Sequence, residues 1–215
     1  MIGKEIHNLA KELFPLNRSI TGDGVRETLS KLQEIIPELS INEVDSGTSV
    51  FDWVVPQEWK VKNAFIITPD GEKICNFADN NLHLIGYSTP INQEMTLEEL
   101  DKYLYSLPEL PEAVPYITSY YSKNWGFCIS DKQRKALKKG KYKVVIDSEH
   151  FSGSLTYGEI ILKGQSDKEI FLSTYICHPS MANNELSGPT VTTFLAKWIK
   201  SLENRRYTYR IIFIP

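Results

Sequence analysis

The sequence predicts an α/β fold in which a mixed or mostly parallel sheet with flanking helices is interrupted by a β-rich insert. Three observations lead to this prediction. Two amphipathic helices open the chain, the last third runs strand, helix, strand, and the segment between these parts differs in composition. A strand–helix–strand order is typical of the βαβ unit, from which parallel sheets are built.

Two amphipathic helices are predicted at the start of the chain. Apolar residues recur at helical spacing within residues 2–13 and again within residues 25–36. Pro15 and Pro37 end the two helices, because proline has no amide hydrogen to donate inside a helix. A polar loop at residues 18–24 joins them.

The middle of the chain, residues 51–150, is rich in aromatic residues and prolines. A Pro-Asp-Gly sequence at residues 69–71 is a strong turn signal, so the segments beside it are predicted to pair as a β-hairpin. Thr96 and Glu99 form a capping box for a helix that runs to about Leu107. The segment is therefore expected to contain more strand than helix.

The change of composition at both ends of this segment predicts two domains. Residues 1–50 and 151–215 are expected to form one discontinuous α/β domain, truncated at its C-terminal end. Residues 51–150 are expected to form an inserted β-rich domain.

The last third of the chain is predicted to hold three strands and one helix. Residues 157–163 and 169–176 are predicted strands joined by a turn, residues 187–203 an amphipathic helix, and residues 207–214 another strand. The apolar run at 170–177 does not alternate with polar residues, as expected for a central strand buried on both faces.

The composition excludes several classes of protein. The chain of 215 residues carries 24 Lys and Arg against 27 Asp and Glu, a net charge of −3 that gives no argument for binding nucleic acid or an anionic membrane. No apolar stretch approaches transmembrane length, and the start is charged rather than signal-like. Three widely spaced cysteines, Cys75, Cys128 and Cys177, point to a reducing compartment, so the sequence predicts a cytoplasmic protein.

The segment from Cys177 to Gly188 is the most informative for function. His178 follows a predicted strand, and Glu185 comes just before a predicted helix. Ligands of open α/β sheets bind outside the carboxyl ends of strands, where a neutral imidazole is a natural metal ligand. The alternative is structural: Glu185 and Ser187 cap the helix, and His178 is a packed histidine. Spacing alone favours this structural alternative.

Two further groups of residues invite a functional interpretation. Cys177 beside His178 resembles a thiol dyad, which we reject because neighbouring strand residues point to opposite faces. Aromatic residues of the middle segment could form a platform for a sugar or peptide, although a role as core is favoured. They support, as an alternative function, a non-catalytic sugar- or peptide-binding or assembly module. These residues are Trp53, Trp59, Tyr116, Tyr120, Tyr121, Trp125 and Phe127.

Several blocks of sequence resemble a known family. They are LFPLNRSITGDG at residues 13–24, FDWVVPQEW at 51–59, PYITSYY at 115–121, ICHPS at 176–180 and YTYRIIFIP at 207–215. Together they resemble a family of bacterial zinc-aminopeptidase-like proteins of unassigned function, and the similarity spans essentially the whole chain. The resemblance implies a co-catalytic zinc peptidase fold with an inserted small domain, of which this chain looks like the N-terminal half.

The resemblance also implies site residues and a function. His178 corresponds to a first zinc ligand, and where the family usually has a bridging aspartate this chain has Asn184, followed by Glu185. A neutral amide replaces a bridging carboxylate poorly. The implied metal-binding residues are His178, Asn184 and Glu185, and no catalytic residue is assigned. The implied function is an aminopeptidase-like zinc metallohydrolase with an incomplete active site, whose complete form acts on peptides or other small molecules.

Two expectations concern this chain by itself. Zinc is the implied cofactor, although a chain with one clear histidine ligand need not bind it, and negligible peptidase activity is expected. Self-association is expected through Phe194, Trp198 and Ile212, because a strand at 207–214 that ends the chain lacks covering elements.

Overall fold

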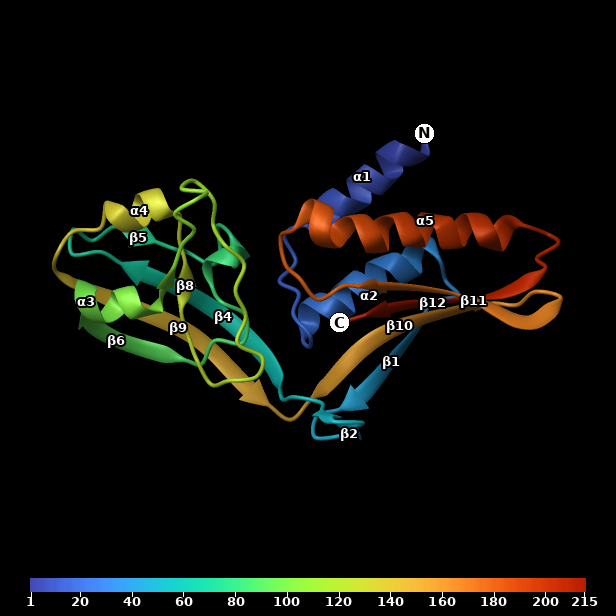
Figure 1. The fold of residues 1–215 in the computed structure, drawn as a ribbon, viewed down its shortest axis with the longest axis horizontal. Helices are drawn as coiled ribbons and strands as arrows, with labels where there is room; N and C mark the ends of the chain where they lie inside the picture. Colours follow the sequence, from blue (N-terminus) through green and yellow to red (C-terminus); the bar gives the residue numbers. More distant parts are fainter. The chain divides into compact units, whose positions relative to one another are not determined.

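The computed structural model describes all 215 residues, and the chain divides into two compact units. Unit 1 comprises Met1–Glu58 and Ser152–Pro215, and unit 2 comprises Trp59–Phe151. The chain therefore leaves unit 1 once and re-enters it once, as the colours of Figure 1 show. None of the helices combines the length and the apolar character that crossing a membrane requires.

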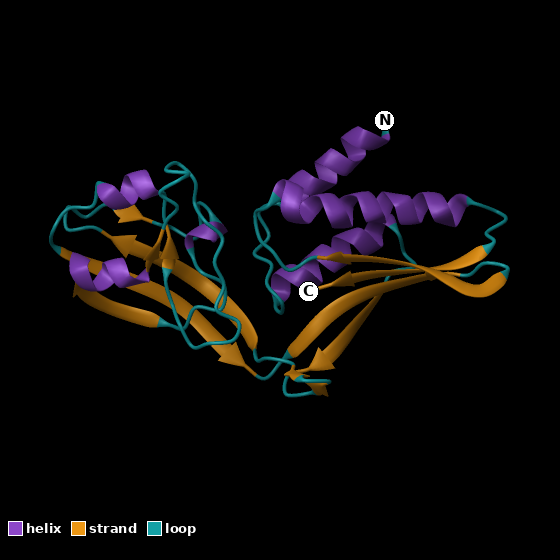
Figure 2. Ribbon diagram, viewed as in Figure 1, coloured by secondary structure: helices purple, strands orange, loops and turns teal.

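Unit 1 has a sheet and three α-helices, and the helices lie on one face of the sheet (Figures 1 and 2). The helices are α1 (Ile2–Leu13), α2 (Asp23–Ile35) and α5 (Ser187–Ser201). The first two end shortly before Pro15 and Pro37, as the sequence predicted. A short hairpin, β2 (Ser49–Val50) and β3 (Trp53–Val54), also belongs to this unit.

The sheet of unit 1 has the strand order β1-β10-β12-β11. Its strands are β1 (Ser40–Asp45), β10 (Ser154–Leu162), β11 (Ser166–Tyr175) and β12 (Tyr207–Ile214). Both β1 and β12 run antiparallel to β10, and only β11 and β12 are parallel. The sheet is therefore mixed, and the mostly parallel alternative is wrong, because a single βαβ unit supplies its only parallel pair.

β11 is an edge strand, which corrects the prediction of a central strand buried on both faces. Phe171 is 58% exposed and Tyr175 is 40% exposed, whereas Leu172 packs against the core. β12 takes the inner position, paired with β10 on one side and β11 on the other. β10 and β11, which the sequence predicted as two strands joined by a turn, are therefore not neighbours in the sheet. β12, which comes later in the chain, lies between them.

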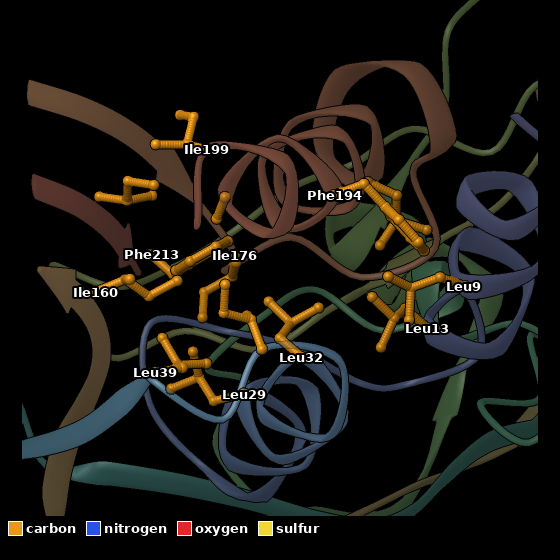
Figure 3. Close-up of a cluster of buried hydrophobic side chains, with 14 of the residues drawn as sticks. Leu9, Leu13, Leu29, Leu32, Leu39, Ile160, Ile176, Phe194, Ile199 and Phe213 are labelled. Carbon is orange, nitrogen blue, oxygen red and sulfur yellow. The ribbon is translucent and has the colours of Figure 1, made fainter. Parts of the chain in front are cut away.

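The core of unit 1 lies between the sheet and its three helices (Figure 3). Gly158 of β10 lets α2 approach closely, because a Cβ atom there would stand 2.7 Å from Leu29 and 2.9 Å from Leu39. Burial of each large apolar side chain stabilises the fold by about 1.5–3 kcal/mol. Members of the core include Leu9, Leu13, Leu29, Leu32, Leu39, Ile160, Ile176, Phe194, Ile199 and Phe213.

Unit 2 is built on a second four-stranded sheet, with the order β5-β4-β9-β6. The hairpin predicted around residues 69–71 is confirmed as β4 and β5, and Gly71 in its turn has a left-handed φ of 84°. The strands are β4 (Glu58–Ile67), β5 (Lys73–Ile74), β6 (Ile91–Thr96) and β9 (Lys141–Phe151).

Short elements complete unit 2. The capping box of Thr96 and Glu99 is confirmed. Its helix stops at Leu100 rather than near residue 107, because Leu104 already pairs with Phe127 of a neighbouring strand. The elements are η1 (Asn81–His83), α3 (Leu97–Leu100), η2 (Asp101–Tyr103), β7 (Leu104–Tyr105), β8 (Phe127–Cys128) and α4 (Asp131–Lys135).

Aromatic side chains of unit 2 pack against one another. Trp59 stacks on Tyr87 with ring centroids 5.6 Å apart, and Tyr120 meets Tyr87 edge-on at 5.1 Å. Trp59 and Tyr87 are buried, whereas Tyr121 is exposed. At least Trp59 and Tyr87 therefore serve as core, the role that the sequence favoured over a ligand platform.

Candidate metal centre

The segment between β11 and α5 forms the candidate metal centre. Ile176 and Cys177, which follow the last residue of β11, are buried, and the side chain of His178 is 25% exposed. The chain turns at Ser180, whose φ of 45° lies in the left-handed region. A π-helical turn, η3 (Ala182–Leu186), then leads into α5. His178 therefore stands just beyond the carboxyl end of a strand, as predicted, but this strand is an edge strand rather than the central one that was expected.

The carboxylate of Glu185 faces His178. The backbone N–H of His178 donates to Oε1 at 3.1 Å, and the ring nitrogen Nδ1 lies 3.1 Å from Oε2. The Glu185 side chain is completely buried. A buried carboxylate needs such partners, because the loss of hydration disfavours its charged form. Both of its oxygens are thus directed to one residue.

Glu185 does not cap α5, so the structural alternative drawn from the sequence is wrong on this point. No side chain makes a capping hydrogen bond at the N-terminus of α5. The hydroxyl of Ser187 donates to the backbone carbonyl of Asn183 instead. The carboxylate of Glu185 is therefore held beside His178 rather than used to begin the helix.

Cys177 also contacts His178. A hydrogen bond between their side chains, together with the one to Glu185, raises the pKa of His178 to about 10 against the opposing effect of partial burial. The rejection of a thiol dyad rested on the alternation of side chains along a strand. Both residues lie beyond the last residue of β11, where the alternation of strand side chains no longer applies.

A buried arginine supports His178 from another part of the chain. Arg18, in the loop between α1 and α2, is 1% exposed. Its guanidinium donates to the backbone carbonyl of His178 at 2.9 Å and to that of Leu13 at 2.5 Å. Burial lowers the pKa of Arg18 to about 10, and the nearby Glu185 and Cys177 partly offset this effect.

Sequence reasoning missed Arg18, which it placed in a polar loop. Arginine is almost never fully buried unless it is paired, so a loop arginine is normally expected to be solvated. The feature of the sequence that could have pointed to Arg18 was its position in the block at residues 13–24, which carries part of the family resemblance. That signal does not identify a partner 160 residues away.

Asn184 is placed differently from Glu185. Its side chain is exposed, and its backbone carbonyl accepts a hydrogen bond of 3.0 Å from the hydroxyl of Tyr175. The Tyr175 ring in turn meets the His178 ring with centroids 5.1 Å apart. Asn184 is therefore linked to the centre through its backbone and Tyr175, whereas Glu185 touches His178 directly.

The residues present fit part of a zinc site. His178 and Glu185 offer an imidazole nitrogen and a carboxylate, whereas zinc sites in proteins take at least three protein ligands. Nowhere in the 215 residues do three or more His, Cys, Asp or Glu side chains gather in an arrangement that could hold a metal ion.

Solved structures define the class of fold. The chain is similar to a zinc aminopeptidase from Bacillus subtilis, with a TM-score of 0.62 at 10% identity, over 99% of this chain and 60% of that one. It is also similar to a peptidase M28 precursor from Shewanella amazonensis, with a TM-score of 0.58 at 12% identity, over 99% and 66%. These likenesses show the fold alone: a mixed α/β fold of the zinc-aminopeptidase type, as predicted.

Nearer relatives define the family. Residues 7–215 match the family described as a domain of unknown function, DUF4910, and the chain belongs to this family. A Clostridium acetobutylicum protein, provisionally named a polysaccharide biosynthesis protein with an aminopeptidase-like domain, is 49% identical over 213 residues, 99% of this chain and 49% of that protein. A crystal structure from the same organism, provisionally titled a peptidase, matches with a TM-score of 0.96 at 49% identity, over 99% of this chain and 50% of that one. The chain thus spans about half the length of these relatives.

Proposed function

We propose that this chain is the aminopeptidase-like part of a zinc metallohydrolase and that His178 belongs to its zinc site. The observation that carries the proposal is the contact between His178 and the buried carboxylate of Glu185 at the end of β11. The fold class and the name of the C. acetobutylicum relative support it. In this proposal unit 1 is the aminopeptidase-like domain and unit 2 is an inserted domain.

The candidate residues take different roles in this proposal. Because Nδ1 of His178 faces Glu185, we assign the other ring nitrogen, Nε2, to the metal. A carboxylate that holds one nitrogen of a ligating histidine sets the tautomer and the orientation of the ring. In this chain Glu185 is the carboxylate that faces Nδ1 of His178. To bind the metal itself, Glu185 would have to give up a contact with His178. Asn184, which is exposed, is a candidate for a weaker oxygen ligand.

The proposed substrate is a peptide or a related small molecule. Zinc, when bound, would polarise the substrate carbonyl and lower the pKa of a bound water molecule. This chain would contribute the oriented imidazole of His178 and the buried carboxylate that orients it. We propose that the remaining ligands lie in the part of the relatives' length that this chain does not cover.

The alternative of a sugar- or peptide-binding module has no observation in its favour. It depended on an aromatic platform, and Trp59 and Phe127 of that group are buried in the core of unit 2. We therefore retain the metallohydrolase as the proposed function.

Zinc binding by the 215-residue chain tests the assignment of His178. We expect His178→Ala to weaken binding by at least about tenfold, the loss typical even of a residue that only orients a ligand. His7→Ala is the matched control, because His7 is an exposed histidine of α1 in the same unit. Isothermal titration calorimetry gives both affinities, and equal affinities of the two variants would contradict the assignment.

Peptidase activity tests the rest of the proposal. We expect a protein of the relatives' full length to hydrolyse aminoacyl anilides, and a chelator or His178→Ala to abolish this turnover. The 215-residue chain alone is expected to show negligible turnover. Full activity of the longer protein in the His178→Ala variant would refute the proposed function.

A further inference from the structure

We propose that Arg18 is a positioning residue of this centre, which fixes the main chain at His178 and thereby the direction of the imidazole. Both hydrogen bonds of Arg18 go to backbone carbonyls, so its role is exercised through another residue. The inference rests on the proposed function only where it concerns the metal. The contacts themselves are hydrogen bonds within the protein.

The guanidinium joins two segments that are 160 residues apart. One of its terminal nitrogens donates to the carbonyl of Leu13, the last residue of α1, and the other donates to the carbonyl of His178. The hydroxyl of Ser180 adds a second link between the same segments, because it donates to the carbonyl of Phe14 at 3.2 Å. The end of α1 is thus joined to the candidate centre at His178 and again two residues later.

The environment of the buried Arg18 side chain indicates that this residue positions its neighbours rather than merely filling space in the core. Its Nε atom is buried and has no hydrogen-bond partner. An unsatisfied buried donor costs free energy, which an apolar side chain of similar size would avoid. The planar fork of arginine, however, can hold two carbonyls in one fixed geometry, and lysine has no such fork. The need to hold two backbone carbonyls in one geometry therefore explains why an arginine occupies this position.

The positive charge of Arg18 also helps to position His178, through Glu185. Its guanidinium lies close enough to Glu185 for their opposite charges to interact. This attraction is strong in a buried setting, where little water screens it. It helps to hold the carboxylate that faces Nδ1 of His178. Arg18 therefore supports His178 by two routes, directly through the backbone carbonyl and indirectly through Glu185.

The variant Arg18→Lys tests this inference, because lysine keeps the positive charge and loses the fork. Arg205→Lys is the matched control. Arg205 also holds backbone carbonyls within unit 1, but these belong to Lys163 after β10 and to Ile199, Lys200 and Leu202 around the end of α5. A change that appears in the first variant alone is thus specific to the candidate centre.

Two readouts separate positioning from mere stability. In the metal-free protein we expect Arg18→Lys to shift the ring-nitrogen NMR signals of His178 and to speed exchange of its Nδ1 proton. We also expect Arg18→Lys to weaken zinc binding about tenfold, as is typical when a ligand loses its support. Arg205→Lys should leave the ring signals and the affinity as in the wild type. A loss of thermal stability in Arg18→Lys without either change would overturn the proposal.

The same measurements distinguish this inference from the proposed function. If the wild type binds no zinc, the proposed function fails, while the ring signals still decide the role of Arg18. If Arg18→Lys does not fold, exchange of the Arg18 guanidinium protons is measured in the wild type, with the exposed Arg206 as reference. Slow exchange with scalar coupling to the His178 carbonyl would support the proposal, and exchange as fast as that of Arg206 would overturn it.

Discussion

At the residue scale, burial decides what the polar side chains of the candidate centre do. Arg18 and Glu185 are both buried, and both direct polar atoms to His178. Asn184 stands beside Glu185 in the sequence and is exposed. The resemblance placed Asn184 and Glu185 together in a metal site, and the difference in exposure now gives them different roles in the proposal.

His150, in β9 of unit 2, provides a prediction for pH dependence. Burial lowers the pKa of His150 below its ordinary 6.5, the charge of Lys123 adds to this effect, and a hydrogen bond with the backbone of Tyr87 opposes it. Between the folded pKa and 6.5 the unfolded chain binds more protons than the folded chain. The free energy of unfolding therefore falls as the pH drops through this window, and the contribution is fully present above it.

Thermal denaturation of the wild type and His150→Gln measures this effect. We expect the Tm of the wild type to fall more than that of the variant between about pH 7.5 and about pH 5.5, because only the wild type carries the partly buried histidine. The same fall in both proteins would show that His150 is not the group responsible.

At the element scale, the start of α2 depends on a close approach between backbone segments. Gly24, the second residue of α2, packs against the loop that carries Arg18. A Cβ atom at Gly24 would stand 2.1 Å from the carbonyl oxygen of Asn17. Helical spacing predicted α2 correctly but gave no reason for a glycine there, since the reason lies in the adjoining loop.

Gly24→Ala is expected to destabilise the protein by about 1–3 kcal/mol, the cost typical of overpacking. The obstructing atoms are backbone atoms and cannot rotate away. Gly3→Ala is the control, because Gly3 is the second residue of α1 and has no atom within 4 Å of its Cβ position. Urea denaturation followed by circular dichroism compares the two, and equal free energies of unfolding would rule out the close approach as the cause.

At the scale of the whole molecule, the sheet of unit 1 has an open edge at β11. Phe171 and Tyr175 of this strand are exposed, and its outer side has no partner strand. The surface that the sequence predicted for self-association is partly wrong. Phe194 is 7% exposed, and β12, which carries Ile212, is paired on both sides. Trp198 is exposed as that prediction requires.

Self-association therefore stays a prediction, and we now expect it to involve β11. Open strand edges beside exposed apolar side chains favour pairing with another copy. Phe171→Thr should weaken association, whereas Ile2→Thr, which replaces an equally exposed residue of α1, should not. Light scattering across a dilution series measures the difference. A wild-type chain that stays monomeric at high concentration would contradict the prediction.

The sequence by itself determined most of the elements and the segment in which the candidate centre lies. Helical spacing, prolines, the turn at residues 69–71 and the Thr96 cap are local signals, so they can be read without the fold. The position of His178 after a strand and of Glu185 before a helix follows from the same local patterns.

Only the tertiary structure decided the strand order and the partners of His178. β12 pairs between two strands that precede it in the chain, which makes β11 an edge strand in spite of its apolar composition. Arg18 reaches His178 across 160 residues, and Cys177 interacts with His178 beyond the end of the strand. These outcomes depend on packing between distant segments, because burial and contact are set by whatever neighbour the fold brings to each residue.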